Sequence, residues 1–332
     1  EKVDLLNEIS YAYNKINPYE GIKYGTQSLS LAEELQWRKG AARANSCLGA
    51  NYFSLSDFLN AFNYWHRAVK INEELGNKTG VANNQHNIGN IYFSQKNYPE
   101  ALKYYESGLK TGKESGNKQL VTNSYSSIGN VYTQMKDYSK ALEYHFNALA
   151  IDEELGLKSN VASVQTDIGN VYNEQGNYSK ALDVLKQALQ LKKETGDKNG
   201  LAKAFTMTGK VYLHISKHVA DGKDVGIYGT VDRNVRQAVI YLDSAVLTAK
   251  EIGYLDNLQK NYEYLSDAYK MSGDYQKALE YTERYRSIKD SIYSQENRDQ
   301  IAMQVAKNEF DKVRFKDNLK LERQKTFTYI GK

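Results

Sequence analysis

The sequence predicts an all-α fold made of repeated helix pairs, and two observations carry this prediction. The first is an internal repeat: the string Ile88-Gly89-Asn90-Ile91-Tyr92 returns, with valine for the second isoleucine, at residues 128–132 and 168–172, a step of 40 residues both times. The second is composition, because the 332 residues include only two prolines, the residue that interrupts helices. Long helices therefore meet few obstacles along this chain.

Each repeat divides into two helices joined by a short turn. In the first helix, Ile88, Ile91 and Tyr92 follow the i, i+3, i+4 spacing of one apolar helix face. A second string, Tyr98-Pro-Glu-Ala-Leu102, returns at the same step and marks the second helix. A glycine such as Gly116 follows the second helix, which fits a left-handed C-cap.

A glycine also recurs inside the first helix, at residues 49, 89, 129, 169 and 209. Glycine within a helix costs about 1 kcal/mol relative to alanine, so its return implies close packing at this position. We expect small residues of the second helix to form the other half of the contact. These residues are Ala61, Ala101, Ala141 and Ala181.

The spacing of small and aromatic residues resembles that of the tetratricopeptide repeat family. One copy of the pattern reads Gly89, Tyr92, Ala101 and Gly108. The usual unit has about 34 residues, and the longer form found here is similar to the repeats of kinesin light chain and of cell-polarity adaptor proteins. The resemblance implies a right-handed α-solenoid of about seven helix pairs over residues 1–290, with degenerate first and last pairs. It also implies a protein or peptide partner.

The repeat is interrupted in its fifth clear copy, where the alanine expected at position 221 comes only at Ala238. The segment from His218 to Thr230 contains three glycines, so we predict a loop insertion at about 213–234. Insertions in repeat arrays often serve binding, but a surface loop of this kind is also tolerated at little cost. Both interpretations stay open.

The repeat pattern stops near residue 290. Residues 291–325 contain many charges and neither proline nor glycine, so we predict a long charged C-terminal helix over residues 291–332. A shorter helix that caps the last repeat is an equal alternative. The same C-terminal helix could also pair two copies of the chain as a homodimer.

The aromatic ending, residues 326–332, resembles the membrane-proximal part of a type of bacterial signalling protein. In those proteins an extracytoplasmic repeat array leads through one transmembrane helix to a histidine kinase, a nucleotide cyclase or a transcriptional regulator. The resemblance implies a periplasmic or other extracytoplasmic location and a transmembrane segment beyond this chain. The basic residues between Lys312 and Lys325 argue instead for the cytoplasm.

Charge and cysteine content narrow the classes of partner. The 44 basic and 40 acidic residues give a net charge of +4, which is too small to indicate a nucleic-acid partner. A single cysteine, Cys47, excludes an internal disulfide. No apolar run approaches the length of about 18 residues that a membrane span needs.

The five histidines form no pattern typical of catalysis or metal binding. His214 and His218 are four residues apart, but no HExxH pattern accompanies them and we expect the helix to end between them. His145 falls where Leu185 falls in the next copy, which predicts a core residue. We therefore predict a chain that is not an enzyme and needs neither cofactor nor metal. The remote alternative is an enzyme subunit that uses the 213–234 insertion, with His214, His218, Asp221, Asp224 and Tyr228 as its chemical groups.

The resemblance to tetratricopeptide repeats implies that the first helix of each pair lines a concave, peptide-binding surface. The residues that map there are Asn83, Asn87, Asn90, Asn123, Ser127, Asn130, Ser163, Asp167, Asn170, Asn173, Lys203 and Lys210. Asparagine is a mediocre helix former, yet it recurs at Asn90, Asn130 and Asn170. Stacked amides offer paired donors and acceptors that can hold the main chain of an extended peptide. The alternative is that these asparagines are solvated residues which duplicated repeats share.

Two functions follow from these observations. The first is a non-catalytic, peptide-binding or protein-binding domain that serves as the sensing or interaction region of a signal-transduction protein. The second is a free intracellular scaffold or adaptor. The two differ in what flanks the chain, so its own residues do not separate them.

Overall fold

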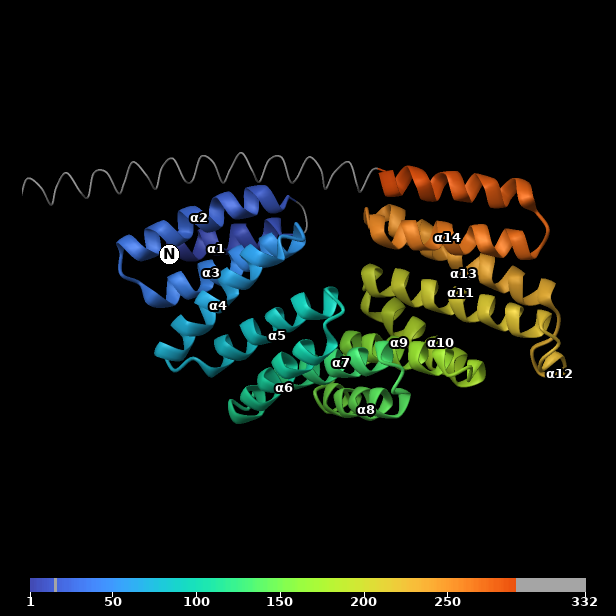
Figure 1. The fold of residues 1–332 in the computed structure, drawn as a ribbon, viewed down its shortest axis with the longest axis horizontal. Helices are drawn as coiled ribbons and strands as arrows, with labels where there is room; N and C mark the ends of the chain where they lie inside the picture. The colour runs from blue at the N-terminus through green and yellow to red at the C-terminus, as the bar shows by residue number, and fades with distance from the viewer. Residues whose placement is uncertain (15–16, 291–332) are drawn as a thin grey trace, which may run out of the picture. The chain divides into compact units, whose positions relative to one another are not determined.

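The computed structural model describes residues 1–14 and 17–290, and helices make up almost all of this part of the chain (Figure 1). The helices are α1 (Lys2–Tyr13), α2 (Pro18–Glu34), α3 (Arg38–Ser54), α4 (Phe58–Glu74), α5 (Lys78–Ser94), α6 (Tyr98–Glu114), α7 (Lys118–Gln134), α8 (Tyr138–Glu154), α9 (Lys158–Glu174), α10 (Tyr178–Thr195), α11 (Lys198–Ala220), α12 (Val225–Tyr228), α13 (Val231–Glu251) and α14 (Leu255–Met271), followed by a helix described over residues 275–290. No strand occurs among the described residues. The predicted all-α fold is confirmed.

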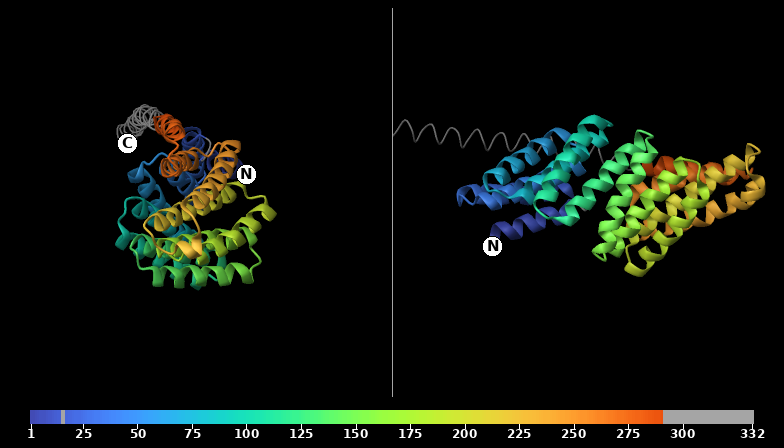
Figure 2. Two further views of the ribbon diagram at one scale, coloured as in Figure 1. Left: turned by 90° about the vertical axis from the view of Figure 1, so that its right-hand side faces the viewer. Right: turned by 90° about the horizontal axis from the view of Figure 1, so that it is seen from below.

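The helices form pairs, in which the first member is here called helix A and the second helix B (Figures 1 and 2). The contacting pairs are α1 with α2, α5 with α6, α7 with α8, α9 with α10, and α11 with α13. At the last pair, the hydroxyl of Ser266 in α14 donates to the carbonyl of Ala278 at 3.0 Å. These are six pairs, and α3 and α4 follow one another in the chain as the members of the predicted seventh.

Contacts divide the chain into two units, and the boundary falls inside α4. One unit covers Glu1–Ala61 and the other covers Phe62–Ser291. The first unit contains α1 to α3, and the second contains the complete pairs from α5 onward. The sequence pattern alone predicts one array over the two units, because the repeat crosses their boundary without a break.

The turns between helices follow from local chemistry. Gly116 has a φ of +70°, a left-handed conformation that glycine adopts without strain, and it ends α6. Asn117 then begins α7, because its side chain accepts a hydrogen bond from the Leu120 amide at 3.1 Å. The same combination of a left-handed glycine and a capping side chain separates α10 from α11, at Gly196 and Asp197. The predicted glycine C-caps are confirmed.

The recurring glycines of helices A make room for a large side chain of the partner helix B. A Cβ atom at Gly169 would lie 2.7 Å from Leu185 Cγ, closer than carbon atoms pack. The same contact recurs in three further pairs, where Gly89 faces Tyr105, Gly129 faces His145 and Gly209 faces Leu242. The nearest group in all four pairs is thus a large side chain and not the expected alanine, although at Gly209 the carbonyl oxygen of Ala238 would also lie 3.3 Å from the Cβ atom.

The alanines of helix B also belong to apolar clusters that include residues of the next pair. Ala101 is fully buried and belongs to a cluster with Ile128 and Val131 of the following helix A. Ala181 is buried in the same way beside Val211. The alanine and the large side chain of helix B thus belong to one apolar cluster with residues of the next helix A, as Ala181 and Leu185 show.

The 213–234 segment contains more helix than the predicted loop. Helix α11 continues to Ala220, residues 225–228 form the short α12, and α13 begins at Val231. The continuation has a physical reason, since Ile215 and Val219 are buried one helical turn apart against apolar residues of α10. The expectation that the helix ends between His214 and His218 is therefore wrong.

The predicted C-terminal helix over residues 291–332 lies outside the described residues, and so does the dimer predicted to form through it. Among the described helices, none is both long and apolar enough to cross a membrane. Nor does the described part of the chain contain a group of three or more residues that could hold a metal ion.

A matched pair of glycine substitutions tests the contact between helices A and B. We expect Gly169→Ala to lower the free energy of unfolding by about 1–3 kcal/mol, because the new methyl group overlaps Leu185. Gly108→Ala should raise it by up to about 1 kcal/mol, because the nearest atom to its Cβ would be 3.4 Å away and helix propensity improves. Urea unfolding measures both, and a shift of the same sign in the two variants would contradict the assignment.

His145 of α8 places a titratable group against Gly129 of its helix A. The side chain is fully buried, and neither ring nitrogen has a hydrogen-bond partner among the described residues. Burial lowers the pKa of His145 from 6.5 to about 4. The predicted core position is confirmed, and the imidazole is held there in its neutral form.

The His145 core position predicts an acid-sensitive stability. The unfolded chain binds a proton at a pKa of about 6.5 and the folded chain only near 4, so stability is complete above about pH 6.5 and falls as the pH drops toward 4. One such histidine should cost about 2 kcal/mol between about pH 7 and pH 5. His145→Leu, which copies Leu185 of the next pair, should remove this part of the loss in urea unfolding. An unchanged loss in the variant would refute the role of His145.

Candidate functional site

The predicted site residues lie on the helices A of the second unit, which contact one another in order: α5 with α7, α7 with α9, α9 with α11, and α11 with α14. Asn83, Asn123, Ser163 and Lys203 occupy one exposed position on four consecutive helices. Asn90, Asn130, Asn170 and Lys210 occupy another, where each is half-buried. Asn90, Asn130 and Asn170 are here called the asparagine ladder. The structure thus places most predicted residues in two rows that cross the helices.

Hydrogen bonds hold some of these side chains in place. The hydroxyl of Tyr105 in α6 donates to Asn90 Oδ1 at 2.7 Å. Ser127 lies 3.5 Å from a ring nitrogen of His86 on the preceding helix A. Lys210 donates to the Glu174 carboxylate at 2.7 Å across the junction of α9 and α11. Neighbouring helices A are therefore joined by polar side chains along the predicted surface.

Asp167 is the one carboxylate among the predicted residues. Its pKa is raised from 3.8 to about 6 because protein surrounds it, although the charge of Lys203, the amide of Asn130 and the charge of Lys192 each lower it. These groups come from α7, α10 and α11, so several helices meet around this carboxyl group. A group with this pKa changes its charge within the mildly acidic range.

Not every predicted residue is available to a ligand. Asn173 is 2% exposed, and its Oδ1 lies 3.1 Å from Nδ1 of His214. Its amide nitrogen has no partner among the described residues. Asn173 therefore lies inside the junction of α9 and α11 and outside the two surface rows. Asn87 is half-buried and Asn123 exposed, and the latter accepts a hydrogen bond from Gln119 of its own helix.

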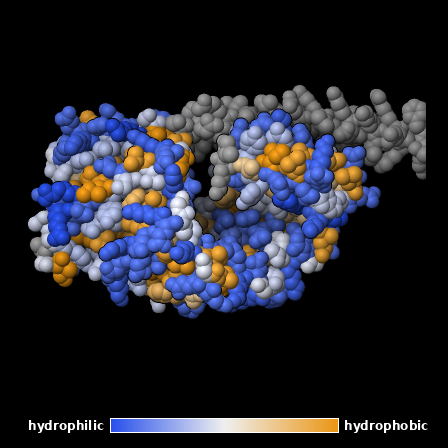
Figure 3. All heavy atoms as spheres, turned by 180° about the vertical axis from the view of Figure 1, so that it is seen from behind, coloured by the Kyte–Doolittle hydropathy of each residue, from blue (hydrophilic) through white to orange (hydrophobic). Residues whose placement is uncertain are grey.

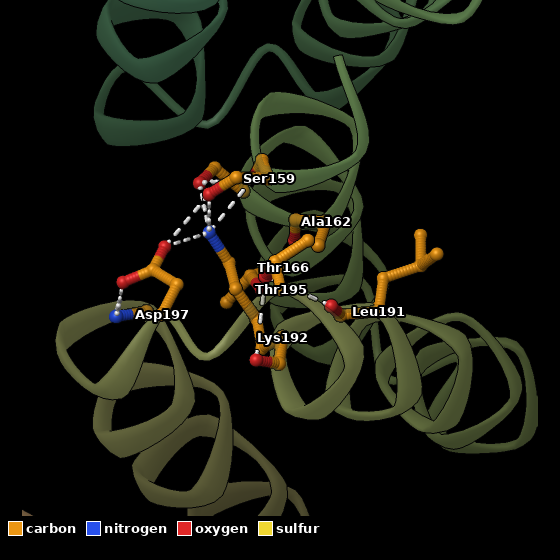
Figure 4. Close-up of polar contacts among 9 residues, drawn as sticks. Ser159, Ala162, Thr166, Leu191, Lys192, Thr195 and Asp197 are labelled. Carbon is orange, nitrogen blue, oxygen red and sulfur yellow. Dashed lines mark hydrogen bonds and ion pairs between the residues drawn. The ribbon is translucent and has the colours of Figure 1, made fainter. Parts of the chain in front are cut away.

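The sequence analysis missed a buried lysine directly behind this surface (Figure 4). Lys192 of α10 is 1% exposed, and its ammonium donates to Asp197 Oδ2 at 2.6 Å and to Ser163 Oγ at 2.7 Å. It also donates to the Ser159 carbonyl at 2.8 Å. One cation thereby joins helix B of this pair to two residues of α9 and to the residue that begins α11.

Asp197 completes this cluster. Burial alone would raise the pKa of Asp197, but hydrogen bonds from Lys192, from the Gly200 amide and from Ser159 hold it at about 2. Gly200 also makes room for the ammonium, since a Cβ there would lie 2.5 Å from Lys192 Nζ. The preceding pairs have Asn72, Gly112 and Asp152 at the position of Lys192, and only this recurring polar or small position hints at the cluster in the sequence.

Of the groups predicted for an enzyme that uses the insertion, the structure brings His218, Asp224 and Tyr228 together but not His214. His214 faces Asn173, whereas His218 lies 2.8 Å from Asp224 of the insertion, so the two histidines do not share one ligand position. Cys47 is buried, and burial raises the pKa of its thiol to about 11, which leaves it protonated and unreactive. The arrangement offers hydrogen-bond donors and acceptors rather than an activated nucleophile.

The face of the molecule that is seen from behind is mainly hydrophilic. Figure 3 shows that hydrophilic residues dominate this face of the molecule and that apolar residues gather there in small, separate groups. Large apolar patches are typical of many stable protein interfaces. A polar surface with regular amide positions favours recognition through hydrogen bonds.

Sequence comparison with known families finds the tetratricopeptide repeat, which matches residues 40–114 and 120–194. No curated protein matches the chain in sequence.

Solved structures similar to this chain include the following three. The apo form of RapI is 17% identical, with a TM-score of 0.65 over 89% of this chain and 100% of that one. A signal transduction ATPase with a tetratricopeptide repeat sensor from Pyrococcus horikoshii is 16% identical, with a TM-score of 0.62 over 89% of this chain and 45% of that one. NprR in complex with its cognate peptide NprX is 14% identical, with a TM-score of 0.57 over 87% of this chain and 80% of that one. At these identities the similarity establishes the fold.

Removal of the buried ammonium should destabilise the protein. Lys192→Met leaves the Asp197 carboxylate without its cation and the two serines without their donor, so we expect a loss of about 3–5 kcal/mol in the free energy of unfolding. The pKa of Asp197 should rise from about 2 at the same time. Lys186→Met, at an exposed position of the same helix, serves as the control and should change stability by less than about 0.5 kcal/mol. Equal effects in the two variants would contradict a structural role for the cluster.

Proposed function

We propose that this chain, in which residues 40–114 and 120–194 match the tetratricopeptide repeat, binds an extended peptide or protein segment along the asparagine ladder. The observation that carries the proposal is the recurrence of one half-buried amide on three consecutive helices A, at Asn90, Asn130 and Asn170. Each pair contributes one amide at the same position. A ligand that follows the row therefore meets the same chemical group at each step.

The chemistry of the amide matches that of a peptide main chain. An asparagine side chain offers two N–H donors and a carbonyl acceptor, and each residue of an extended peptide offers one donor and one acceptor. Asn90 is oriented for this task, because the Tyr105 hydroxyl occupies its oxygen and leaves the nitrogen to donate to a ligand carbonyl. Recognition of this kind depends on the main chain of the ligand more than on its side chains.

The charged residues at one end of the surface add selectivity. The helices α5 and α7 present amides and hydroxyl groups, whereas α9 and α11 add Asp167, Lys203 and Lys210. A ligand that lies across all four helices would meet a neutral region first and a charged region next. Its orientation along the surface would then depend on where its own charges lie.

Two of the similar structures support this function. NprR, of the same fold, was solved with its cognate peptide. The Pyrococcus horikoshii protein joins a repeat array, described as a sensor, to a signal transduction ATPase. We therefore propose that the present chain is the non-catalytic sensing or interaction region of a signal-transduction protein.

Replacement of the ladder tests the proposal. The triple variant Asn90→Ala, Asn130→Ala and Asn170→Ala should lose binding of peptides selected on the wild-type chain from a randomised library. Its helix content should be unchanged, because alanine is a better helix former than asparagine. Isothermal titration and circular dichroism measure the two quantities.

The control for this experiment is Asn147→Ala, which removes an exposed amide from α8, a helix B. It should bind the selected peptides as the wild type does. Retained affinity in the triple variant would overturn the proposal. Loss of affinity with a loss of helix content would assign the asparagines to stability instead.

A further inference from the structure

Asp167 is an exception among the side chains that cross the helices A. Three rows, which begin at Asn83, Asn87 and Asn90, step by 40 residues from α5 through α7 and α9 to α11. Of the side chains in these rows, Asp167 is the only carboxylate, and it is half-buried. A carboxylate withdrawn from water costs free energy unless a cation or several hydrogen bonds compensate it.

The cations of the neighbouring helices have other partners. The Lys192 ammonium of α10 donates to Asp197 Oδ2 at 2.6 Å (Figure 4). The Lys210 ammonium of α11 donates to the Glu174 carboxylate at 2.7 Å. Asp167 itself takes part in none of the ion pairs found in the described part of the chain. Its carboxylate is therefore left without a direct cationic partner.

Lys203 of α11 balances the charge of Asp167 only in part. Its side chain is exposed, and its ammonium lies over the Tyr254 ring, 5.9 Å from the ring centroid. Burial raises the pKa of Asp167 to about 6, although the charges of Lys203 and Lys192 and the amide of Asn130 act in the opposite direction. The surroundings therefore stabilise the ionised carboxylate less well than water does.

We infer that Asp167 is the subsite for a cationic group of the ligand, an amino or guanidinium group. The inference rests on the proposed function and gives it a ligand chemistry at α9. A carboxylate has two oxygens with about four lone-pair sites, so the Asn130 amide leaves acceptors for the N–H groups of a ligand. Such a cation supplies the direct partner that the described residues do not.

The subsite gives the asparagine ladder a register. Amides that repeat at every helix A bind a main chain equally well when it is shifted by one step. A single carboxylate on α9 removes this freedom, because one cationic group of the ligand must lie there. An apolar or acidic group at the same place would displace water from the carboxylate without supplying a charge, so the site selects against it.

Peptide selection tests the subsite directly. A randomised peptide library, in one form with a free and in one with an acetylated N-terminus, is selected on the wild type and on Asp167→Lys. The wild type should enrich Lys or Arg at one position of the peptide, and Asp167→Lys should enrich Asp or Glu there. If the cation is instead the N-terminal ammonium, acetylation of the selected peptides should remove their binding.

A double-mutant cycle measures the contact without a reversed charge. Replacement of the enriched lysine of a selected peptide by norleucine should weaken binding to the wild type about tenfold, and binding to Asp167→Asn far less. For an N-terminal ammonium, acetylation takes the place of norleucine in the cycle. Isothermal titration gives the four affinities. The control is Asp183→Asn, which removes an exposed carboxylate from α10 and should respond to norleucine as the wild type does.

The outcomes separate this subsite from the proposed function. Peptides enriched without any preferred cationic group would refute the subsite and leave the function standing, whereas a chain that enriches no peptide would refute both. An equal effect of norleucine on the wild type and on Asp167→Asn would also overturn the inference. Asp167→Asn should unfold at the same or a higher urea concentration than the wild type. A lower one would assign the carboxylate to packing of the helices.

Discussion

The contact between a glycine of helix A and a large side chain of helix B sets the separation of the two helices in four of the pairs. A methyl group at Gly169 would overlap Leu185, so the two backbones are closer than any other residue allows. The alanine four residues before the large side chain lies on the same face of helix B and shares its apolar cluster with residues of the next helix A. The stacking of pairs, and with it the alignment of the asparagine ladder, depends on this contact.

Much of the fold could be predicted because its determinants are local. The 40-residue step, the left-handed glycine and the capping side chain each act within a few residues, as Gly116 and Asn117 show. The partner of the glycine could not be predicted from spacing. Ala101 and Tyr105 lie one turn apart on the same helix, and only the rotation of that helix decides which of them faces Gly89. The insertion was misjudged because its glycines lie beyond residue 220, whereas Ile215 and Val219 continue the helix before them.

At the candidate site too, some features could be predicted from the sequence and others could not. The rows on helices A could be predicted, since each repeats a residue type at a fixed step. Asn173 could not, because its burial depends on His214 from the next pair. Lys192 had no signal of its own, for a lysine near a helix end is normally solvated. Its burial requires Ser159, Ser163 and Asp197 to converge from two other helices, a condition that no single segment of sequence reveals.

His145 and Leu185 occupy the same position in consecutive pairs, each against the glycine of its helix A. This equivalence has a consequence for how such a protein changes in evolution. Because each pair fits its neighbours through one shared pattern, the duplication or deletion of a single 40-residue unit joins surfaces that already match. Such an event in a unit that contains Asn90, Asn130 or Asn170 adds or removes one amide of the asparagine ladder. On the proposed function, the length of ligand that the protein accommodates is therefore a heritable quantity that recombination within the gene alters in whole steps, while the packing of the remaining pairs stays as it was.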